Sequence, residues 1–390
     1  MTQREAVIVE AVRTPIGRAF KGSLIGVRPD DLSGLVIAEL LARMPALDPQ
    51  RVDDVIWGAA IQHGEQSMNL GRNVAALGSL PDTVPGTTVN RMCASSLQAI
   101  RIAAHAILAG EGEVFIAGGV ESTTRASTKG FDPEDMNPRF TDESRPDFVN
   151  HMYIPMGLTA ENVAERYDVS REDMDAYAKL SQDRAVAAQQ RGFFDAEILP
   201  VTTPEGVRIT RDDGPRPNTT LEVLAALKPA FKPDGKVTAG NSCPLNDGAA
   251  GVVVMERSVA ERLGLRPRAR IVASAVTGIA PEIMGVGPIS AIRSVLERAS
   301  LSIGDIDVVE LNEAFAAQVL PVVRETGISI GEQLNPNGGA IALGHPFGMT
   351  GARIMTTLLH ELDEREGRYG LETMCVGGGQ GMAMIVERLP

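Results

Sequence analysis

The residue whose position in the sequence most clearly suggests chemistry is Cys93. It lies between a β-forming run, Thr87–Val89, and a segment with apolar residues at helical spacing, Ala94–Leu108, which Gly110 would end. A thiol at the start of a helix feels the positive end of the helix dipole, which favours the nucleophilic thiolate. Small buried cysteines are also common in protein cores, so Cys93 by itself leaves both interpretations open.

Two glycine-rich stretches in the second half of the sequence carry further reactive side chains. His345 lies in NPNGGAIALGHPFGMTGAR, and Cys375 comes shortly before the three glycines of CVGGGQG. Such a density of glycine indicates a backbone that turns sharply or approaches another group closely. His345 could also be a hydrogen-bonded turn residue, and Cys375 a buried strand residue. CVGGGQG lacks the Lys-Ser/Thr pair of a phosphate loop, but its backbone N–H groups could form an oxyanion hole.

A third candidate is Asn312, which follows an apolar run and precedes small residues in ELNEAFAAQ. It could cap a helix, or it could project into a site at the strand ends. A histidine that takes a proton from a thiol activates that thiol as a nucleophile. A second thiol suggests proton transfer to a poor carbon or sulfur leaving group. Cys93, His345, Asn312 and Cys375 therefore form a chemically coherent set.

The elements that would position this set occur twice in the chain. The matched segments are Ala6–Val12 with Arg270–Val276, Leu32–Met44 with Ile289–Ser300, Val52–Gly58 with Ile306–Asn312, the helix after Cys93 with Gly351–Glu364, and Glu113–Gly119 with Leu371–Gly379. This weak repetition predicts two similar α/β halves. Parallel strands covered by helices would place the strand-to-helix turns of both halves at one rim.

Between the two halves, Glu121–Pro244 is interpreted as an insertion of helices and loops. Within it, Ser170 and Asp173 have the spacing of a capping box at the start of a helix. In the first half, Asp30 or Asp31 is expected to cap the helix at 32–44.

Composition excludes several classes of protein. The 390 residues are 44% hydrophobic and 22% charged, typical of a globular protein, and the net charge of −13 argues against nucleic acid and anionic membranes as partners. Three scattered cysteines are too few for a disulfide framework or a zinc site. No stretch approaches the ~20 apolar residues of a membrane span, and the N-terminus lacks the apolar core of a signal peptide. We expect a cytoplasmic protein with no metal.

Six motifs, taken in order, make the sequence resemble the thiolase family, the acyl-CoA C-acyltransferases. They are VNRMCASS, YIPMGLTAENVAERY, KVTAGNSCPLNDGAA, ELNEAFAAQ, NPNGGAIALGHPFGMTGAR and CVGGGQG. The resemblance implies an α/β fold of five layers, αβαβα, made of two duplicated halves with an inserted loop domain. The implied domains are residues 1–121, completed by about 246–267, then the CoA-binding loop domain at 122–245, and the C-terminal half at 268–390.

The resemblance also implies a role for each reactive residue. Cys93 would be the nucleophile that becomes acylated, and His345 would deprotonate it. Asn312 would hold a water that completes an oxyanion site with His345. Cys375 would protonate the departing enolate and then deprotonate the incoming CoA. The backbone N–H groups of Cys93 and Gly377 would form a second oxyanion hole.

CoA would be a substrate rather than a permanently bound cofactor. Residues matching the family's CoA and acyl-channel positions are Arg216, Met156, Phe231, Ala239, Cys243 and Phe315. Two neighbours of the site depart from the family pattern, since Ser96 stands where glycine is usual and Cys243 where many members have serine.

The function expected from the resemblance is that of a degradative 3-ketoacyl-CoA thiolase of β-oxidation, which cleaves its substrate with CoA to acetyl-CoA and a shortened acyl-CoA. Pro155 before Met156 favours this degradative type over short-chain biosynthetic members. The alternatives are an acetoacetyl-CoA-forming thiolase, a β-ketoadipyl-CoA thiolase and a non-catalytic acyl-CoA-binding protein. A homodimer, or a homotetramer, is implied.

Overall fold

The computed structural model describes residues 4–126 and 133–390, which contain one ten-stranded mixed sheet. The first three residues of the predicted N-terminal half and residues 127–132 of the predicted loop domain lie outside the described residues. The strand order is β10-β11-β12-β9-β1-β8-β5-β3-β4, with β2 pairing off β8. The strands are β1 (Ala6–Arg13), β2 (Gly17–Arg18), β3 (Asp54–Gly58), β4 (Gly86–Val89), β5 (Val114–Ser122), β8 (Asn246–Glu256), β9 (Ala269–Gly278), β10 (Val308–Leu311), β11 (Tyr369–Val376) and β12 (Gln380–Arg388).

The predicted repetition of the two halves is confirmed by the strand pairing. In the first half β3 runs parallel to β5, β5 is antiparallel to β8, and β8 is antiparallel to β1. In the second half β10, β11, β12 and β9 pair in the same sense and order. Within the sheet, the described strands of the two halves pair with each other through a short antiparallel contact of β1 with β9, at Val7↔Arg270 and Ile8↔Ala269.

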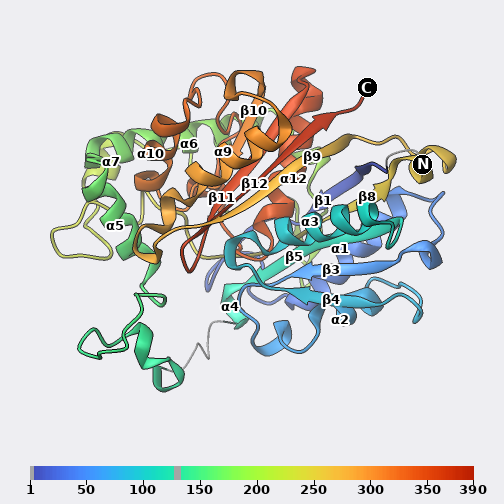
Figure 1. Cartoon of the computed structure of the whole chain (residues 1–390), viewed down its shortest axis with the longest axis horizontal. Coiled ribbons are helices and arrows are strands. Elements are labelled where there is room, and N and C mark those ends of the chain that lie inside the picture. Colours follow the sequence, from blue (N-terminus) through green and yellow to red (C-terminus); the bar gives the residue numbers. More distant parts are fainter. Residues whose placement is uncertain (1–3, 127–132) are drawn as a thin grey trace.

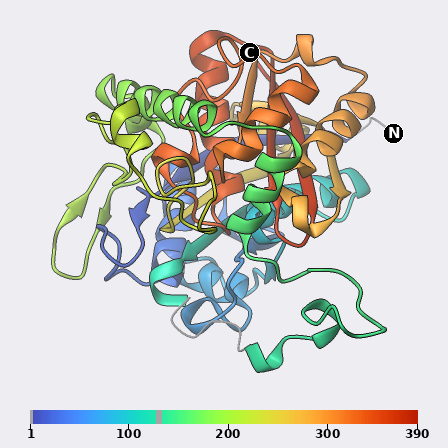
Figure 2. The ribbon, with the colours of Figure 1, turned by 90° about the vertical axis from the view of Figure 1, so that its left-hand side faces the viewer.

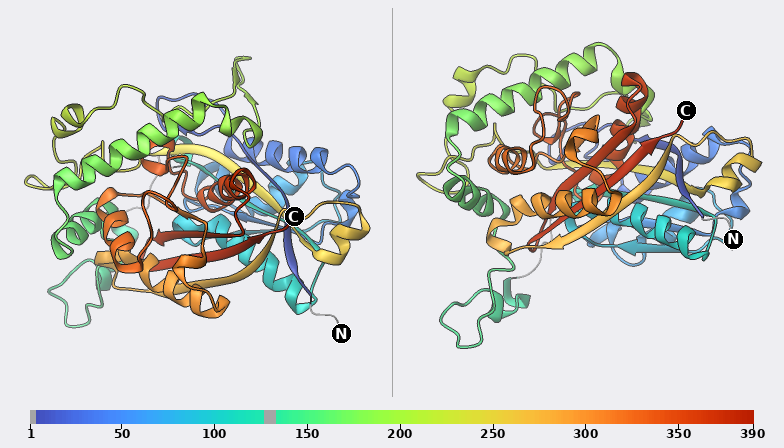
Figure 3. Two further views of the ribbon diagram at one scale, coloured as in Figure 1. Left: turned by 90° about the horizontal axis from the view of Figure 1, so that it is seen from above. Right: turned by 45° about the horizontal axis from the view of Figure 1, so that its top comes forward.

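Helices complete five layers in the order αβαβα. The six layer-forming helices are α1 (Pro29–Arg43), α2 (Leu70–Leu77), α3 (Ser95–Ala109), α9 (Gly287–Ala299), α10 (Ala316–Thr326) and α12 (Thr350–Arg365). Helices α3 and α12 lie side by side in the middle layer, where their apolar side chains cluster with strands of both halves. Helices α1 and α2 cover the outer face of the first half, and α9 and α10 cover that of the second (Figures 1 and 3). The five-layered fold is therefore confirmed.

The middle position of α3 explains its composition. The stretch Met92–Ala109 is the one described helical segment long and apolar enough to cross a membrane. Here both of its long faces pack against protein, because the two half-sheets lie on either side of it and α12 lies alongside. The helix ends where expected, at Gly110, whose φ of 81° is the left-handed conformation that glycine adopts most readily.

Helix α1 begins earlier than the sequence suggested. Pro29 occupies its first turn and Arg28 is the N-cap residue, so the expectation that Asp30 or Asp31 caps the helix is wrong. Proline is well suited to the first helical position because its missing N–H has no partner there in any case. Asp30 and Asp31 instead lie within the first turn, where acidic side chains interact favourably with the helix dipole.

The inserted region is built mostly of helices and loops, as expected. Its elements include α4 (Thr123–Ala126), α5 (Met156–Arg166), α6 (Arg171–Gln190), β6 (Val201–Thr202), β7 (Arg208–Ile209) and α7 (Leu221–Ala225). The predicted start of α6 is confirmed, since the Ser170 hydroxyl oxygen accepts the backbone N–H of Asp173 at 3.0 Å. Residues 133–155 project away from the body, as the green segment in Figures 1 and 2 shows.

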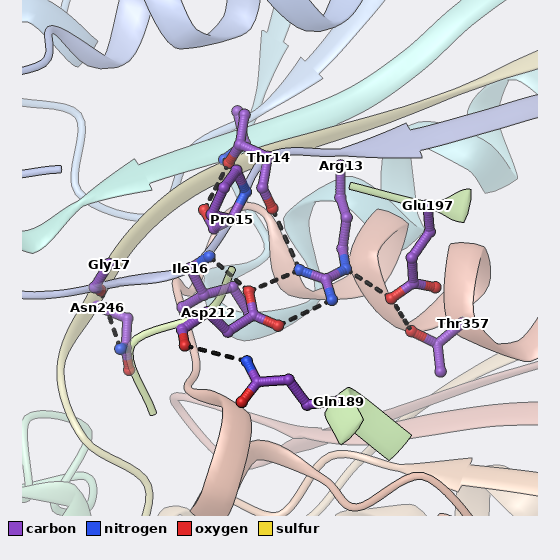
Figure 4. Close-up of polar contacts among 11 residues, drawn as sticks. Arg13, Thr14, Pro15, Ile16, Gly17, Gln189, Glu197, Asp212, Asn246 and Thr357 are labelled. Carbon is purple, nitrogen blue, oxygen red and sulfur yellow. Dashed lines mark hydrogen bonds and ion pairs between the residues drawn. The ribbon is translucent and has the colours of Figure 1, made fainter. Parts of the chain in front are cut away.

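Arg13, at the end of β1, anchors this inserted region to the sheet. Its buried guanidinium donates through Nε to Glu197 at 2.7 Å and through both Nη atoms to Asp212 at 2.8 and 2.9 Å (Figure 4). Glu197 also accepts the hydroxyl of Thr357 on α12, at 3.3 Å. Burial by itself would lower the pKa of Arg13, but the charges of Asp212 and Glu197 more than offset it and raise that pKa. One side chain thus joins β1, the insertion and the middle layer.

Replacing Arg13 by alanine would leave Asp212 and Glu197 buried without their counter-charge, and breaking a buried pair in this way typically costs about 3–5 kcal/mol. The matched control is Arg293→Ala, because Arg293 is 63% exposed and its pair with Glu325 is expected to contribute about 0–1 kcal/mol. We expect a large drop in the thermal midpoint of Arg13→Ala and almost none in the control, measured by scanning calorimetry. Similar midpoints for the two variants would contradict the anchoring role.

Candidate active site

Cys93 lies in a single 3-10 turn, Met92–Ala94, that leads directly into α3. The backbone before it is unusual, since Met92 has a φ of 47°, a conformation that costs a non-glycine residue roughly 1–3 kcal/mol. Burial raises the pKa of Cys93 to about 11. Burial thus opposes the expected effect of the helix dipole on the thiol, because desolvation disfavours the charged form.

Two backbone N–H groups point at the sulfur of Cys93. They belong to Gly377 and to Cys93 itself, and both lower the pKa of the thiol against the effect of burial. Gly377 begins the turn between β11 and β12, in which Gly378 and Gly379 have φ values of 78° and 79°. The structure thus brings the predicted pair of N–H donors together at the predicted nucleophile.

His345 lies between α11 (Ala340–Leu343) and α12 and is 1% exposed. Its Nδ1 is 2.6 Å from the Thr350 hydroxyl, which donates to the carbonyl of Pro346 at 2.8 Å. Because a carbonyl only accepts, the Thr350 proton is committed to Pro346, and the network assigns a proton to His345 Nδ1. Nε2 is then the unprotonated nitrogen. Burial, followed by the charge of Arg353, lowers the pKa of His345 to about 3, so the imidazole is neutral.

Asn312 lies directly beside that nitrogen. Its Nδ2 is 3.3 Å from His345 Nε2 and donates to the lone pair. The backbone N–H of Asn312 donates to the carbonyl of Thr373 at 3.0 Å, which ties the end of β10 to β11. The side-chain oxygen is buried and accepts no hydrogen bond from the described residues. It can therefore accept one from a bound molecule.

The three cysteines, scattered in the sequence, are neighbours in space, and all are free thiols. Cys375 in β11 is 2% exposed, and its sulfur donates to Gln318 Oε1 at 3.5 Å. Burial raises the pKa of Cys375 well above its ordinary value, and Cys93 and Cys243 raise it further. Burial raises the pKa of Cys243 as well, again with a contribution from Cys93. In the described ranges no group of three or more His, Cys, Asp or Glu side chains is placed to hold a metal ion.

Ser96, one of the departures from the family pattern, joins the two central helices. Its buried hydroxyl oxygen accepts the backbone N–H of Ala352 at 2.9 Å. Ala352 lies in the first turn of α12, where N–H groups have no partner within the helix. Next to it, a Cβ on Gly351 would come within 2.3 Å of the backbone nitrogen of Leu97. The start of α12, which follows His345, is thus held against the start of α3, which follows Cys93.

The residues predicted to line the CoA channel lie close together, apart from Ala239. The rings of Phe231 and Phe315 meet edge to face with centroids 5.9 Å apart. Met156 and Cys243 pack on the same apolar cluster as Phe315, and Cys243 donates its backbone N–H to Ala314 at 2.9 Å. Ala239 is exposed in the turn that precedes Cys243.

Arg216 lies in a loop that contacts α11. The neighbouring Gly214 approaches the carbonyl of Ala342 so closely that a Cβ would come within 2.1 Å of it. Burial lowers the pKa of Arg216, and the charge of Arg18 lowers it further, so the two guanidinium groups are neighbours. Arg18 was not singled out in the sequence.

Two residues that hold His345 were also missed in the sequence. Thr350 fixes the tautomer, and Asn246 Oδ1 accepts the backbone N–H of His345 at 3.0 Å. Both lie within motifs quoted above, but a threonine and an asparagine in glycine-rich loops carry no signal of their own. Only the bond partners distinguish them from ordinary turn residues.

Comparison with known proteins gives the same fold and family. The family description "Thiolase, N-terminal domain" matches residues 6–258, and "Thiolase, C-terminal domain" matches residues 265–388. The crystal structure of the Bacillus anthracis acetyl-CoA acetyltransferase superposes with a TM-score of 0.91 at 41% identity, over 99% of both chains.

Curated relatives agree over the whole chain. A β-ketoadipyl-CoA thiolase of Escherichia coli is 50% identical, one of Pseudomonas aeruginosa is 48% identical, and a 3-ketoacyl-CoA thiolase of Erwinia tasmaniensis is 47% identical, each alignment covering 99% of this chain and 100% of the relative. The duplicated fold and these matches define an acyltransferase. The chain belongs to the thiolase family.

Thr350→Val would remove the hydroxyl that holds His345 in the tautomer with a free Nε2. We expect acetoacetyl-CoA thiolysis to fall, by up to the roughly 10²–10⁴-fold that a positioned general base contributes. Thr356→Val is the matched control, because its buried hydroxyl donates to a carbonyl of the same helix, that of Ala352 at 2.8 Å. The rates are measured from the loss of 3-ketoacyl-CoA absorbance. Equal rates in Thr350→Val and Thr356→Val would contradict the tautomer assigned to His345.

Proposed function

We propose that this protein cleaves a 3-ketoacyl-CoA with CoA, through an acyl group carried on Cys93. The observation that carries the proposal is the meeting of two thiols, Cys93 and Cys375, with the His345–Asn312 pair and the N–H of Gly377. A thiol that only packs in the core requires neither an adjacent neutral base nor N–H groups directed at its sulfur. A non-catalytic acyl-CoA carrier would require none of these groups.

In the first half-reaction His345 Nε2 takes the proton of the Cys93 thiol, and the sulfur attacks the 3-keto carbon. The C2–C3 bond then breaks, the acyl group stays on Cys93, and the acetyl-CoA enolate leaves. Cys375 gives its proton to C2 of that enolate. The enolate oxygen is stabilised by protonated His345 and by a water held by Asn312, whose buried Oδ1 is free to accept.

In the second half-reaction the Cys375 thiolate takes the proton of the CoA thiol, and the CoA sulfur attacks the acyl group on Cys93. The oxyanion of this step lies between the N–H groups of Cys93 and Gly377. Losing one such donor typically costs about 10²–10³-fold in rate. Cys93 leaves as the thiol after recovering its proton from His345, and the shortened acyl-CoA is released.

Before substrate binds, burial keeps the reactive groups uncharged. The raised pKa of Cys93 and the lowered pKa of His345 both disfavour an ion pair. Charge separation then becomes favourable only when the substrate carbonyl receives the negative charge. This limits reaction of Cys93 with other electrophiles.

For CoA we propose that Arg216 and Arg18 bind phosphate groups and that Met156, Phe231 and Phe315 contact the pantetheine and acyl portions. Two neighbouring guanidinium groups give an acidic protein the local positive charge that a polyanionic substrate needs. Cys243 extends the same channel, and the exposed Ala239 is proposed to contact CoA outside it. No permanently bound cofactor takes part in this scheme.

The acyl substrate proposed here is β-ketoadipyl-CoA. The sequence favoured a general degradative enzyme of β-oxidation, with β-ketoadipyl-CoA as an alternative. Several relatives at 46–50% identity are β-ketoadipyl-CoA thiolases, and this supports the alternative over the first interpretation. The domain boundaries, the oligomeric state and the cytoplasmic location stay predictions.

Incubation with acetyl-CoA should add one acetyl group to Cys93, because the second half-reaction is reversible. Intact-mass spectrometry and peptide mapping detect the adduct, which should be absent from Cys93→Ala. Cys375→Ser should still be acetylated but lose at least about 10²-fold in thiolysis, the contribution of general acid–base catalysis. An adduct that persists in Cys93→Ala, or full thiolysis by Cys375→Ser, would reject the assigned roles.

Substrate choice is tested with two CoA esters of the same chain length. β-Ketoadipyl-CoA and 3-ketohexanoyl-CoA differ only in the terminal carboxylate, so their ratio of kcat/KM measures recognition of that charge. We expect a preference of at least about tenfold for β-ketoadipyl-CoA, equivalent to about 1.4 kcal/mol. A preference for 3-ketohexanoyl-CoA would instead support a thiolase of β-oxidation.

A further inference from the structure

Glu121, near the end of β5, is a fully buried carboxylate that the scheme above does not use. Its Oε2 accepts the backbone N–H of Ala60 at 3.0 Å and that of Gly348 at 2.9 Å. Its Oε1 accepts the backbone N–H of Ile61 at 3.1 Å and the side-chain amide of Gln66 at 2.5 Å. Four N–H groups therefore converge on one side chain, and only Gly348 among them belongs to the second half of the chain.

From Glu121 a series of hydrogen bonds leads to the nucleophile. Ala60, whose N–H binds Glu121, accepts through its carbonyl the side-chain amide of Asn90 at 2.9 Å. The side-chain oxygen of Asn90 accepts the backbone N–H of Met92 at 2.8 Å. Met92 precedes Cys93 and holds the positive φ of 47°. The series of hydrogen bonds thus ends at Met92, the strained residue that orients the turn carrying Cys93.

The hydrogen bond from Gly348 to Glu121 connects the same carboxylate to the loop that carries His345. Gly348 follows His345 by three residues, and its loop lies directly on the end of β5. A Cβ on Gly348 would come within 2.2 Å of the carbonyl of Val120, and one on Gly119 within 2.1 Å of the carbonyl of Gly348. No side chain fits between the backbones of Gly119 and Gly348. The distance between the end of β5 and the His345 loop therefore depends on the polar contacts at the edge of this contact.

We infer that Glu121 is a positioning residue that fixes the His345 loop relative to the Cys93 turn. Its Oε2 accepts the N–H of Gly348 in that loop and the N–H of Ala60, which is linked to the turn through Asn90. The inference rests on the proposed roles of Cys93 and His345. Those two residues belong to different halves of the chain, and Glu121 Oε2 is the atom that both hydrogen-bond paths share.

A carboxylate suits this position better than an amide. All four partners are donors, and a carboxylate accepts on both oxygens, whereas glutamine would direct its own NH₂ at two of them. Burial raises the pKa of Glu121 to about 7, with the four N–H groups opposing the shift. The charge of Glu121 also adds slightly to the raised pKa of Cys93. Its presence near a nucleophilic thiol is therefore an electrostatic disadvantage, which a geometric role explains.

The test is Glu121→Gln, with two readouts that a general loss of structure would move together. Because misplacing reacting groups by about 1 Å can cost 10²-fold, we expect kcat for thiolysis to fall at least tenfold while KM for CoA stays within twofold. The KM for CoA is the second readout, because Arg216 and Arg18, proposed to bind the phosphate groups of CoA, belong neither to the His345 loop nor to the Cys93 turn. Glu256→Gln is the control, because Glu256 is also buried. Its described side-chain hydrogen bonds stay within the start of the following helix, at Ser258 and at the N–H of Val259, 3.2 Å away.

A smaller loss of kcat, or a rise in the KM for CoA that parallels the loss of kcat, would overturn the inference. If Glu121→Gln does not fold, Asn90→Ala interrupts the same series at an exposed position and should lower kcat in the same selective way; an unchanged kcat there would equally overturn it. Acylation of Cys93 in the unaltered protein separates the two proposals. If that protein acquires no acetyl group the proposed function fails, whereas equal acetylation rates in Glu121→Gln and the unaltered protein reject only the role of Glu121.

Discussion

The structure depends on one contact, that between the starts of α3 and α12 in the middle layer. Each helix follows a reactive loop, so the two loops can meet only if the helices meet first. Glycine at 351 allows the backbones to touch, and the hydroxyl of Ser96 satisfies an N–H of α12 that has no partner within the helix. The rest of the fold supports this arrangement. Two half-sheets enclose the helix pair, and the outer helices cover the sheets.

Burial has a second effect at this contact, since it determines the charge of the reactive groups. Desolvation disfavours both a thiolate and an imidazolium, so the resting site is neutral despite the helix dipole. At Cys93 the backbone N–H groups of Gly377 and of Cys93 itself oppose the effect of desolvation. At His345 the Asn312 amide donates to the Nε2 lone pair and so favours the uncharged imidazole.

The inserted region is connected to the same centre through a charged anchor. Arg13 binds Glu197 and Asp212 of the insertion, and Glu197 also accepts a hydrogen bond from α12. The surface that presents Arg216 and Phe231 is thereby held relative to the layer that carries His345. A buried charge pair is costly to break. The proposed CoA-binding surface and the candidate active site come from distant parts of the sequence and are connected through Arg13.

The sequence by itself determined the fold class, the repetition of the two halves and the candidates for the reactive residues. Strand and helix periodicity, glycine at sharp turns and the types of Cys93, His345 and Cys375 are local properties, and local properties can be recognised in a sequence. Three things were decided only by the tertiary structure. The pKa of Cys93 is set by burial, which no spacing reveals. The meeting of Cys243 with Cys93 and Cys375, and the part that Ser96 plays, depend on which backbones come into contact across the two halves. The partners of Thr350 and Glu121 lie on other segments, and a hydrogen bond between distant residues leaves no periodic pattern in the sequence.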